Sequence, residues 1–218
     1  MKKRVFLLSL LLLPLASCGG NPSNTKYPIV EEGVVFDFND MKYMYYGSYP
    51  QTVVSDTNLK NQLLAIETTN DRGFIEYNGE EYLRCNANPH SRGSKYSSGG
   101  DIVAGATDFF KVEPLVWRVI NSDDKGNYTL LSEKVVFAHI FDRRENAYQY
   151  SKIRDWLLFE FHPVAFKQSQ NNNILLHDAN EDLDVSSISN DVNGDPVFLL
   201  SWRDYTNGAF GFSPNYTV

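Results

Sequence analysis

The sequence predicts an α+β domain. Residues 115–132 and 74–83 have the alternating apolar pattern and the turn residues of β-hairpins. Residues 59–66 and 151–162 carry apolar side chains at helical spacing. Since 42% of the chain is hydrophobic and 14% is aromatic, the composition is that of a folded globular protein. We therefore expect strands paired as hairpins, two or more short helices and long polar loops.

The hairpin at residues 115–132 is the clearest apolar unit of the chain. Leu115, Trp117 and Val119 alternate with residues that point the other way, and a polar turn separates them from the second strand. Pro114 has no backbone N–H to donate, so the first strand is expected to bulge there or to run along an edge.

Turn and cap residues set the limits of the other elements. Asn78 and Gly79 suit a type I′ turn between the strands of the second hairpin. Ser151 is a predicted N-cap, and Pro163 is expected to end the following helix at His162.

The first 18 residues have the layout of a bacterial lipoprotein signal. Basic residues at positions 2–4 precede an apolar run at residues 5–15, too short to cross a bilayer as a mature helix. Residues 15–18 (Leu-Ala-Ser-Cys) resemble a lipobox, whose cysteine receives acyl chains, palmitate among them, before cleavage on its N-terminal side. The resemblance implies a signal peptide at residues 1–17 and a membrane anchor on Cys18. The alternative is an ordinary secretory signal with an incidental cysteine.

Cleavage before Cys18 would leave a flexible tether at residues 18–33 and a single domain at residues 34–218. It would remove the three basic residues at positions 2–4 and change the formal net charge from −7 to −10. Because an acidic chain repels phosphate backbones, we expect no nucleic acid partner. The expected location is the cell envelope, facing outward; the sequence gives no oligomeric state.

Sequence motifs for catalysis and for metal binding are missing. If Cys18 is lipidated, Cys85 has no partner for a disulfide within the chain and is expected to be a small packing residue. The four histidines lie far apart, without metal-ligand spacing. Residues 191–195 place oxygen ligands at alternate positions, as at the start of a calcium loop, but Pro196 and Trp202 stand where that loop needs Gly and Glu. The sequence therefore predicts no enzyme, no cofactor and no metal.

The three tryptophans are the possible ligand platforms. Trp117 and Trp156 fall within apolar periods, which favours core packing over ligand binding. Trp202 follows a loop and opens a short helix with a predicted capping box at residues 201–204. Trp202 and Tyr205 are the candidate ligand-binding residues.

Several aromatic-anchored blocks recur in one order over most of residues 40–212. They are residues 46–51 (Tyr-Gly-Ser-Tyr-Pro-Gln), 110–119 (Phe-Lys-Val-Glu-Pro-Leu-Val-Trp-Arg-Val), 128–132, 150–157, Phe161 with 165–166, and 197–201. In this order they resemble a family of bacterial exported domains of unknown function, the DUF6273 domain. That family is in turn similar to the fold shared by C-type lectins and formylglycine-generating sulfatase modifiers. The similarity implies a twisted antiparallel sheet with flanking helices and long loops. It does not imply catalysis, because the modifier enzymes need a pair of reactive cysteines and here Cys85 stands alone.

The chain departs from that family in two places. Leu158 stands where the family usually carries Asn, and the sequence stops at Val218, before the closing Trp-Leu-Arg segment. We therefore expect an incomplete copy whose missing strands would leave ladder groups exposed beside the hairpin at residues 115–132. The alternative is a shorter variant whose tail caps the sheet.

Together these features favour a cell-envelope lipoprotein that acts as a binding module for a glycan or a peptide. Abundant aromatic side chains and long polar loops suit such ligands. A structural or adhesion protein without a small ligand is the alternative, and an envelope enzyme whose groups come from separated positions is the third.

Overall fold

The structure is a computed structural model that describes residues 5–9, 27–89, 91–96, 98–144, 147–178, 193–210 and 212, with the backbone alone at residues 5–9, 178, 193, 202 and 203. The chain divides into two compact units. The first unit comprises residues 1–47 and 115–218, and the second comprises residues 48–114. This division does not test the prediction of a single domain at residues 34–218.

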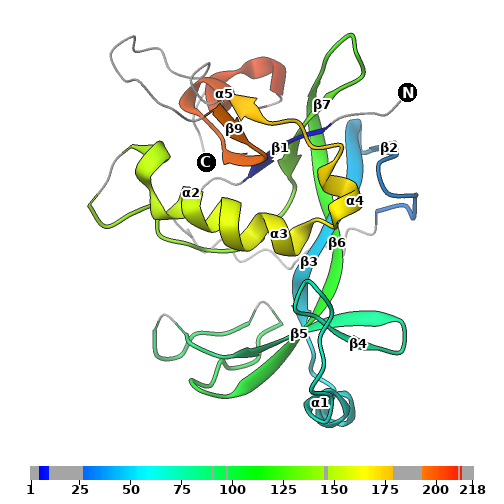
Figure 1. Cartoon of the computed structure of the whole chain (residues 1–218), viewed down its shortest axis with the longest axis vertical. Coiled ribbons are helices and arrows are strands. Elements are labelled where there is room, and N and C mark those ends of the chain that lie inside the picture. Colours follow the sequence, from blue (N-terminus) through cyan, green and yellow to red (C-terminus); the bar gives the residue numbers. More distant parts are fainter. Residues whose placement is uncertain are drawn as a thin grey trace. The chain divides into compact units, whose positions relative to one another are not determined.

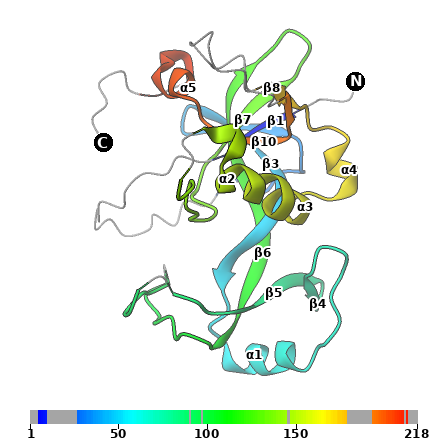
Figure 2. The same cartoon turned by 60° about the vertical axis from the view of Figure 1, so that its left-hand side comes forward.

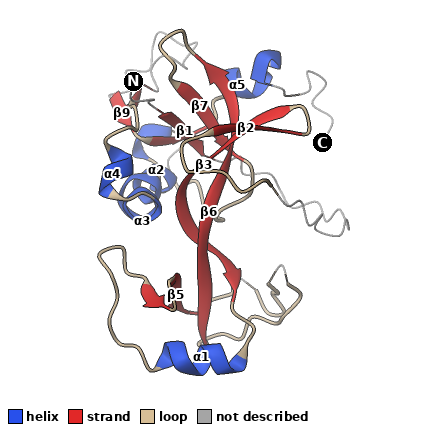
Figure 3. Ribbon diagram, turned by 90° about the vertical axis from the view of Figure 1, so that its right-hand side faces the viewer, coloured by secondary structure: helices blue, strands red, loops and turns tan. Residues whose placement is uncertain are grey.

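A mostly antiparallel, open sheet with a few short helices confirms the predicted α+β class (Figure 3). Its strands lie in the order β10-β1-β7-β6-β3-β2. The bounds are β1 Val5–Ser9, β2 Val35–Phe38, β3 Met41–Val53, β6 Thr107–Ser122, β7 Tyr128–Ser132 and β10 Val197–Leu199. Strands β3 and β6 each contribute residues to both units.

The predicted hairpin is formed by β6 and β7. Trp117 pairs with Ser132, and the register of this pair shifts between Val119 and Asn121. β6 lies between β7 and β3, so it does not run along an edge of the sheet. Pro114 lies between the part of β6 that pairs with β5 and the part that pairs with β7, so its missing N–H interrupts neither ladder.

The core of the first unit holds what we call the buried aromatic cluster, which comprises Tyr46, Trp117, Phe161 and Phe166. Trp117 is fully buried, and its Nε1 donates to the carbonyl oxygen of Tyr46 at 2.7 Å. The rings of Trp117 and Phe161 lie 6.3 and 6.1 Å from that of Phe166. All four residues come from the aromatic-anchored blocks noted in the sequence, so here those blocks supply packing.

Helices α2 (Lys152–Trp156) and α3 (His162–Ala165) are joined by a π-helical turn, Leu157–Phe161 (Figure 2). Ser151 caps α2 as predicted, because its side chain accepts a hydrogen bond from the Arg154 N–H. The predicted end at His162 is wrong. The helical conformation continues from the π-helical turn through Pro163 to Ala165.

Shorter elements complete the first unit. They are α4 Gln168–Asn171, β8 His177–Asp178, β9 Asn193–Asp195, α5 Trp202–Thr206 and two 3₁₀ turns at Tyr148–Tyr150 and Gly208–Phe210. The predicted capping box of α5 is confirmed, since the side chains and backbone N–H groups of Ser201 and Asp204 bond to each other.

The second unit contains the other predicted hairpin, β4 (Ile75–Tyr77) and β5 (Glu80–Asn86). Asn78 and Gly79 both have positive φ, 52° and 79°, as a type I′ turn requires. Helix α1 (Thr57–Leu64) is present but begins two residues before the predicted start. The core of the second unit consists of Val54, Leu63, Ile75, Tyr82 and Phe109.

The predicted signal peptide contributes a strand to the full chain. β1 lies between β7 and β10 and runs parallel to both (Figure 1, dark blue). In the full chain the edge of β7 that faces away from β6 is therefore paired. The expectation of an incomplete copy stays a prediction. Cys18 and residues 19–26 of the predicted tether lie outside the described residues. Among the described residues, no helix has the length and apolar character needed to span a bilayer.

Candidate functional site: an aromatic pocket

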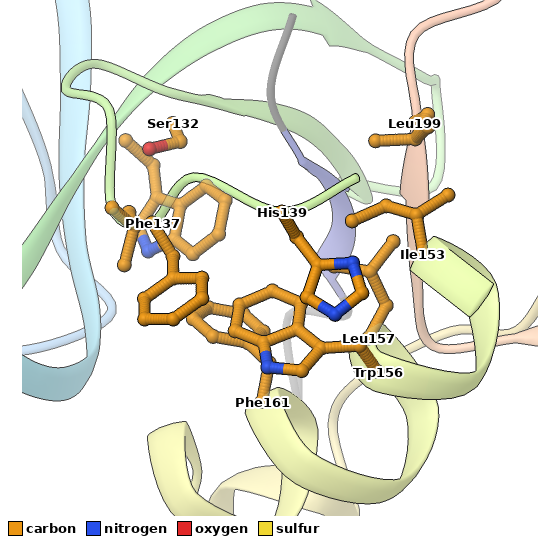
Figure 4. A pocket seen from close by; sticks show the side chains of 10 residues that line it. Ser132, Phe137, His139, Ile153, Trp156, Leu157, Phe161 and Leu199 are labelled. Carbon is orange, nitrogen blue, oxygen red and sulfur yellow. The ribbon is translucent and has the colours of Figure 1, made fainter. Parts of the chain in front are cut away.

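A pocket in the first unit lies between α2 and the segment that follows β7 (Figure 4). Its cavity volume is about 30 Å³, which is room for about two water molecules. Its walls are mostly apolar and comprise Trp117, Ser132, Val136, Phe137, His139, Ile153, Trp156, Leu157, Phe161 and Leu199.

Three rings form what we call the aromatic platform: Phe137, His139 and Trp156 (Figure 4). The Phe137 ring is stacked on the Trp156 ring, with 4.8 Å between the ring centroids and 17° between the ring planes. The His139 ring is also stacked on Trp156, at 5.6 Å and 23°. Phe137 is 46% exposed, and Trp156 and His139 are partly exposed. The platform therefore presents aromatic surface to solvent beside an apolar cavity.

The platform is held by contacts between its two segments. The N–H of Ile153 donates to the carbonyl oxygen of Phe141 at 3.0 Å, and the N–H of Lys152 donates to the Asp142 carboxylate at 3.2 Å. These bonds attach the irregular segment after β7 to the first turn of α2. Since Ile153 and Leu157 are buried, α2 is fixed with Trp156 at the pocket.

The polar groups around the cavity are few, and two of them bond to backbone carbonyls. The Ser132 hydroxyl donates to the carbonyl oxygen of Lys134 at 2.6 Å. The Nδ1 atom of His139 is hydrogen-bonded to the carbonyl of Ile140 at 2.7 Å. Such a site can bind an apolar group and stack on a planar or flat-faced ligand.

Asp195, the last residue of the calcium-like pattern, has a cationic partner. It is 1% exposed and accepts two hydrogen bonds from Arg154, from Nε at 2.9 Å and from Nη2 at 2.8 Å. Burial, followed by the charge of Asp195, raises the pKa of Tyr148. The ion pair joins α2 to β9 and is structural. Among the residues that the structure describes, no group of three His, Cys, Asp or Glu could hold a metal ion.

The second unit has a buried polar group around Asp108, which is 7% exposed. Its carboxylate accepts hydrogen bonds from the Tyr96 hydroxyl at 2.5 Å and from Lys60 Nζ at 3.2 Å. Burial and the nearby Asp108 raise the pKa of the Cys85 thiol. A protonated, partly buried thiol fits the predicted packing role of Cys85.

Tyr205, the predicted site residue whose side chain the structure describes, does not line this pocket. Cys18 and the side chain of Trp202 lie outside the described residues. Tyr205 is partly buried, and its ring lies 5.6 Å from that of Phe212. Trp117 is a core residue as predicted, whereas Trp156, predicted to be core, is partly exposed and lines the pocket.

Phe137 and His139 were missed by the sequence argument. They lie in a segment without regular secondary structure, so no period marks the direction of their side chains. The available signal was an apolar run at residues 135–141 that ends in polar residues and fits neither a strand nor a helix pattern.

Comparison with known proteins gives this chain no relative. No protein-family model matches it. No curated protein and no solved structure matches it either.

Proposed function

We propose that this protein is a lipid-anchored lipoprotein of the bacterial cell envelope, facing outward, with a non-catalytic module that binds peptide ligands. The aromatic platform is its ligand site. The observation that carries the proposal is the half-exposed Phe137 ring stacked on Trp156 over an apolar cavity. We also propose that the domain is DUF6273-like and related to the C-type lectin fold.

The cavity volume favours the end of a single aliphatic side chain as the inserted group. A space of about 30 Å³ is too small for a drug-sized ligand, which typically needs about 300 Å³ or more. Each methyl or methylene group that is buried there is worth about 0.8 kcal/mol. Stacking of the ligand backbone on Phe137 and Trp156 would add to this, and the expected affinity is weak, in the millimolar to micromolar range.

A glycan is the second candidate. The flat faces of Phe137 and Trp156 suit the apolar face of a sugar ring. A sugar also needs hydrogen-bond partners for its hydroxyl groups, and at the cavity the Ser132 O–H and the His139 Nδ1 atom already bond to backbone carbonyls. This shortage of polar partners favours a peptide.

The membrane anchor is proposed from residues 15–18, which resemble a lipobox. Acyl chains on Cys18 would hold the acidic domain at a membrane surface without basic residues, since each buried CH₂ contributes about 0.8 kcal/mol. Metabolic labelling with a fatty-acid analogue tests the assignment. Cys18→Ser should abolish the label and Cys85→Ser should retain it. Undiminished labelling of Cys18→Ser would refute the anchor.

The ligand site is tested with capped tripeptides. Acetyl-Ser-Leu-Ser-amide should bind the wild-type chain, and the acetyl-Ser-Ser-Ser-amide control should not. Phe137→Ala and Trp156→Ala should each weaken binding about tenfold, because each removes part of the stacked surface. Phe159→Ala is the matched control, since Phe159 follows α2 closely, is 73% exposed and does not line the pocket.

The outcomes separate the candidates. The peptide site is supported if Phe159→Ala binds the leucine peptide as wild type does and the two platform variants bind it more weakly. Binding of N-acetylglucosamine oligomers in place of the leucine peptide would move the proposal to the glycan. If no variant differs from wild type, the platform is not the ligand site.

A further inference from the structure

We propose that the space occupied by β1 in the full chain is a docking slot for an extended apolar segment of a partner polypeptide. The slot lies between β7 and β10 and becomes vacant when residues 1–17 are removed. The inference therefore rests on the signal-peptide cleavage in the proposed function. It concerns a different surface from the aromatic platform.

β1 shows how such a segment is held. It pairs with both neighbours in parallel, so that Leu7 lies opposite Leu130 of β7 and Val197 of β10. At the next position, Leu8 lies opposite Leu131 and Phe198. Main-chain hydrogen bonds on two edges hold an inserted strand more firmly than pairing with one edge does.

The neighbouring side chains determine which segment fits. Leu130 and Val197, beside one strand position, are fully buried. Beside the next position, Phe198 is 3% exposed and Leu131 packs against the cluster of Ile120 and Phe198. Because successive residues of a strand point to opposite faces, both faces of the slot are apolar. The occupant must therefore be a continuous apolar run, as in strands buried on both faces, and not an alternating one.

Cleavage before Cys18 would remove β1 and leave two strand edges unpaired. Among the described strands, β10 pairs with β1 and with no other. Unpaired backbone groups beside buried side chains such as Leu130 and Val197 are costly, and open edges recruit strands. Insertion of a partner strand would restore both ladders. The expected partner runs parallel to β7 and carries four consecutive apolar residues. This is the length of β1 that pairs with β7, Val5–Leu8.

The first experiment reads the occupied slot in the wild-type full chain by amide hydrogen exchange. Amides of β7 and β10 that point toward β1 should exchange as slowly as those of β7 that point toward β6. If the amides that point toward β1 exchange fast while those that point toward β6 exchange slowly, β1 is not paired with its neighbours and the proposal is rejected.

The second experiment empties the slot without altering β1. A protease site is placed within residues 19–26, and the chain is folded first and cut afterwards. The cut chain is then incubated with a labelled peptide of residues 2–9, Lys-Lys-Arg-Val-Phe-Leu-Leu-Ser. The peptide should replace the leader in the cut chain. The uncut chain should take up far less, because its tethered leader competes at an effective concentration of about 1 mM.

The matched control is the same peptide with Leu7→Pro, which lacks one ladder donor and should bind at least about tenfold more weakly. Equal binding of the two peptides, or no binding of either, would overturn the slot. Concentration-dependent dimerisation of the cut chain without peptide would assign the slot to a second copy and would also overturn the proposal of a partner.

The outcomes distinguish a failure of the slot from a failure of the proposed function. If Cys18→Ser still takes up the fatty-acid label but the cut chain binds the peptide, the anchor is wrong and the slot exists. If the platform variants lose the leucine peptide and the cut chain takes up no leader peptide, the ligand site stands and the slot is wrong.

Discussion

The buried aromatic cluster and the aromatic platform are built from similar residues but differ in their cover. In the buried cluster, Trp117 is fully buried and its Nε1 is bonded to the carbonyl oxygen of Tyr46. In the platform, Trp156 is partly exposed and is stacked with Phe137, itself 46% exposed. Both tryptophans lie in apolar periods, so periodicity alone does not separate a core residue from a surface platform.

The difference lies in what packs over each ring. Phe166 lies 6.3 Å from the Trp117 ring, and Trp117 also belongs to a central strand. Trp156 is the last residue of α2 and is covered by the irregular segment that carries Phe137 and His139. Phe137, which covers Trp156, is itself 46% exposed, so this pair of rings presents aromatic surface to a ligand.

Trp117→Ala should have the largest effect on stability. Truncating a buried Trp typically costs about 3–5 kcal/mol of unfolding free energy, and this variant also leaves the carbonyl of Tyr46 without its donor. Thermal and denaturant unfolding measure the loss. Trp156→Ala should cost much less, because part of its ring is already exposed. Equal losses for both variants would remove the distinction between the two clusters.

Gly47→Ala should be the next most damaging change, through the buried cluster. Gly47 has φ +72°, and an added Cβ would lie 2.5 Å from the Phe166 ring and 2.7 Å from the carbonyl oxygen of Ala165. Overpacking and the left-handed conformation together should cost about 2–4 kcal/mol. Gly126→Ala is the matched control, since φ is +79° there and no atom lies within 4 Å of the added Cβ.

The control should show the conformational cost alone, about 1 kcal/mol. The difference between the two alanine variants, read as a shift of the unfolding midpoint, therefore measures how tightly Phe166 is packed. If the two shifts are equal, Phe166 is free to move and the cluster is looser than the structure indicates.

His162 should give the smallest effect, a dependence of stability on pH. Burial lowers the pKa of His162, whose ring lies 5.6 Å from that of Phe166. An unfolded histidine has a pKa of about 6.5, so the unfolded chain takes up a proton before the folded chain does. Stability is thus complete above pH 6.5 and falls as the pH drops toward the lowered folded value.

Melting temperatures at pH 7.5 and pH 5.5 check this expectation. His162→Gln should reduce the difference between the two temperatures. His139→Gln, which changes the platform and not the buried cluster, should leave it as in wild type. A pH dependence that is unchanged in His162→Gln would place the titrating group elsewhere.

Local rules predicted much of the fold because short-range chemistry determines those parts. The positive φ angles at Asn78 and Gly79 and the cap at Ser151 depend only on neighbouring residues. The alternation after Pro114 identified Leu115 and Trp117 as buried. Each of these features can be recognised within about ten residues of sequence.

Other features depend on distant partners and could not be predicted. The π-helical turn carries the helix through Pro163, and the apolar leader becomes a strand only because β7 and β10 flank it. The platform has the same origin, since Phe137 comes from an irregular segment and is positioned by its contact with Trp156. The candidate site was therefore less predictable than the sheet.

The most direct measurement compares two indole signals in one spectrum. In an ¹⁵N-labelled wild-type chain titrated with acetyl-Ser-Leu-Ser-amide, the Nε1–H signal of Trp156 should shift in a saturable way. The Nε1–H signal of Trp117, which also lines the cavity but is buried and bonded to the Tyr46 carbonyl, should shift much less. Assignment comes from Trp156→Phe and Trp117→Phe. A Trp156 signal that does not move, or moves equally with acetyl-Ser-Ser-Ser-amide, would contradict the claim that the aromatic platform binds an apolar side chain.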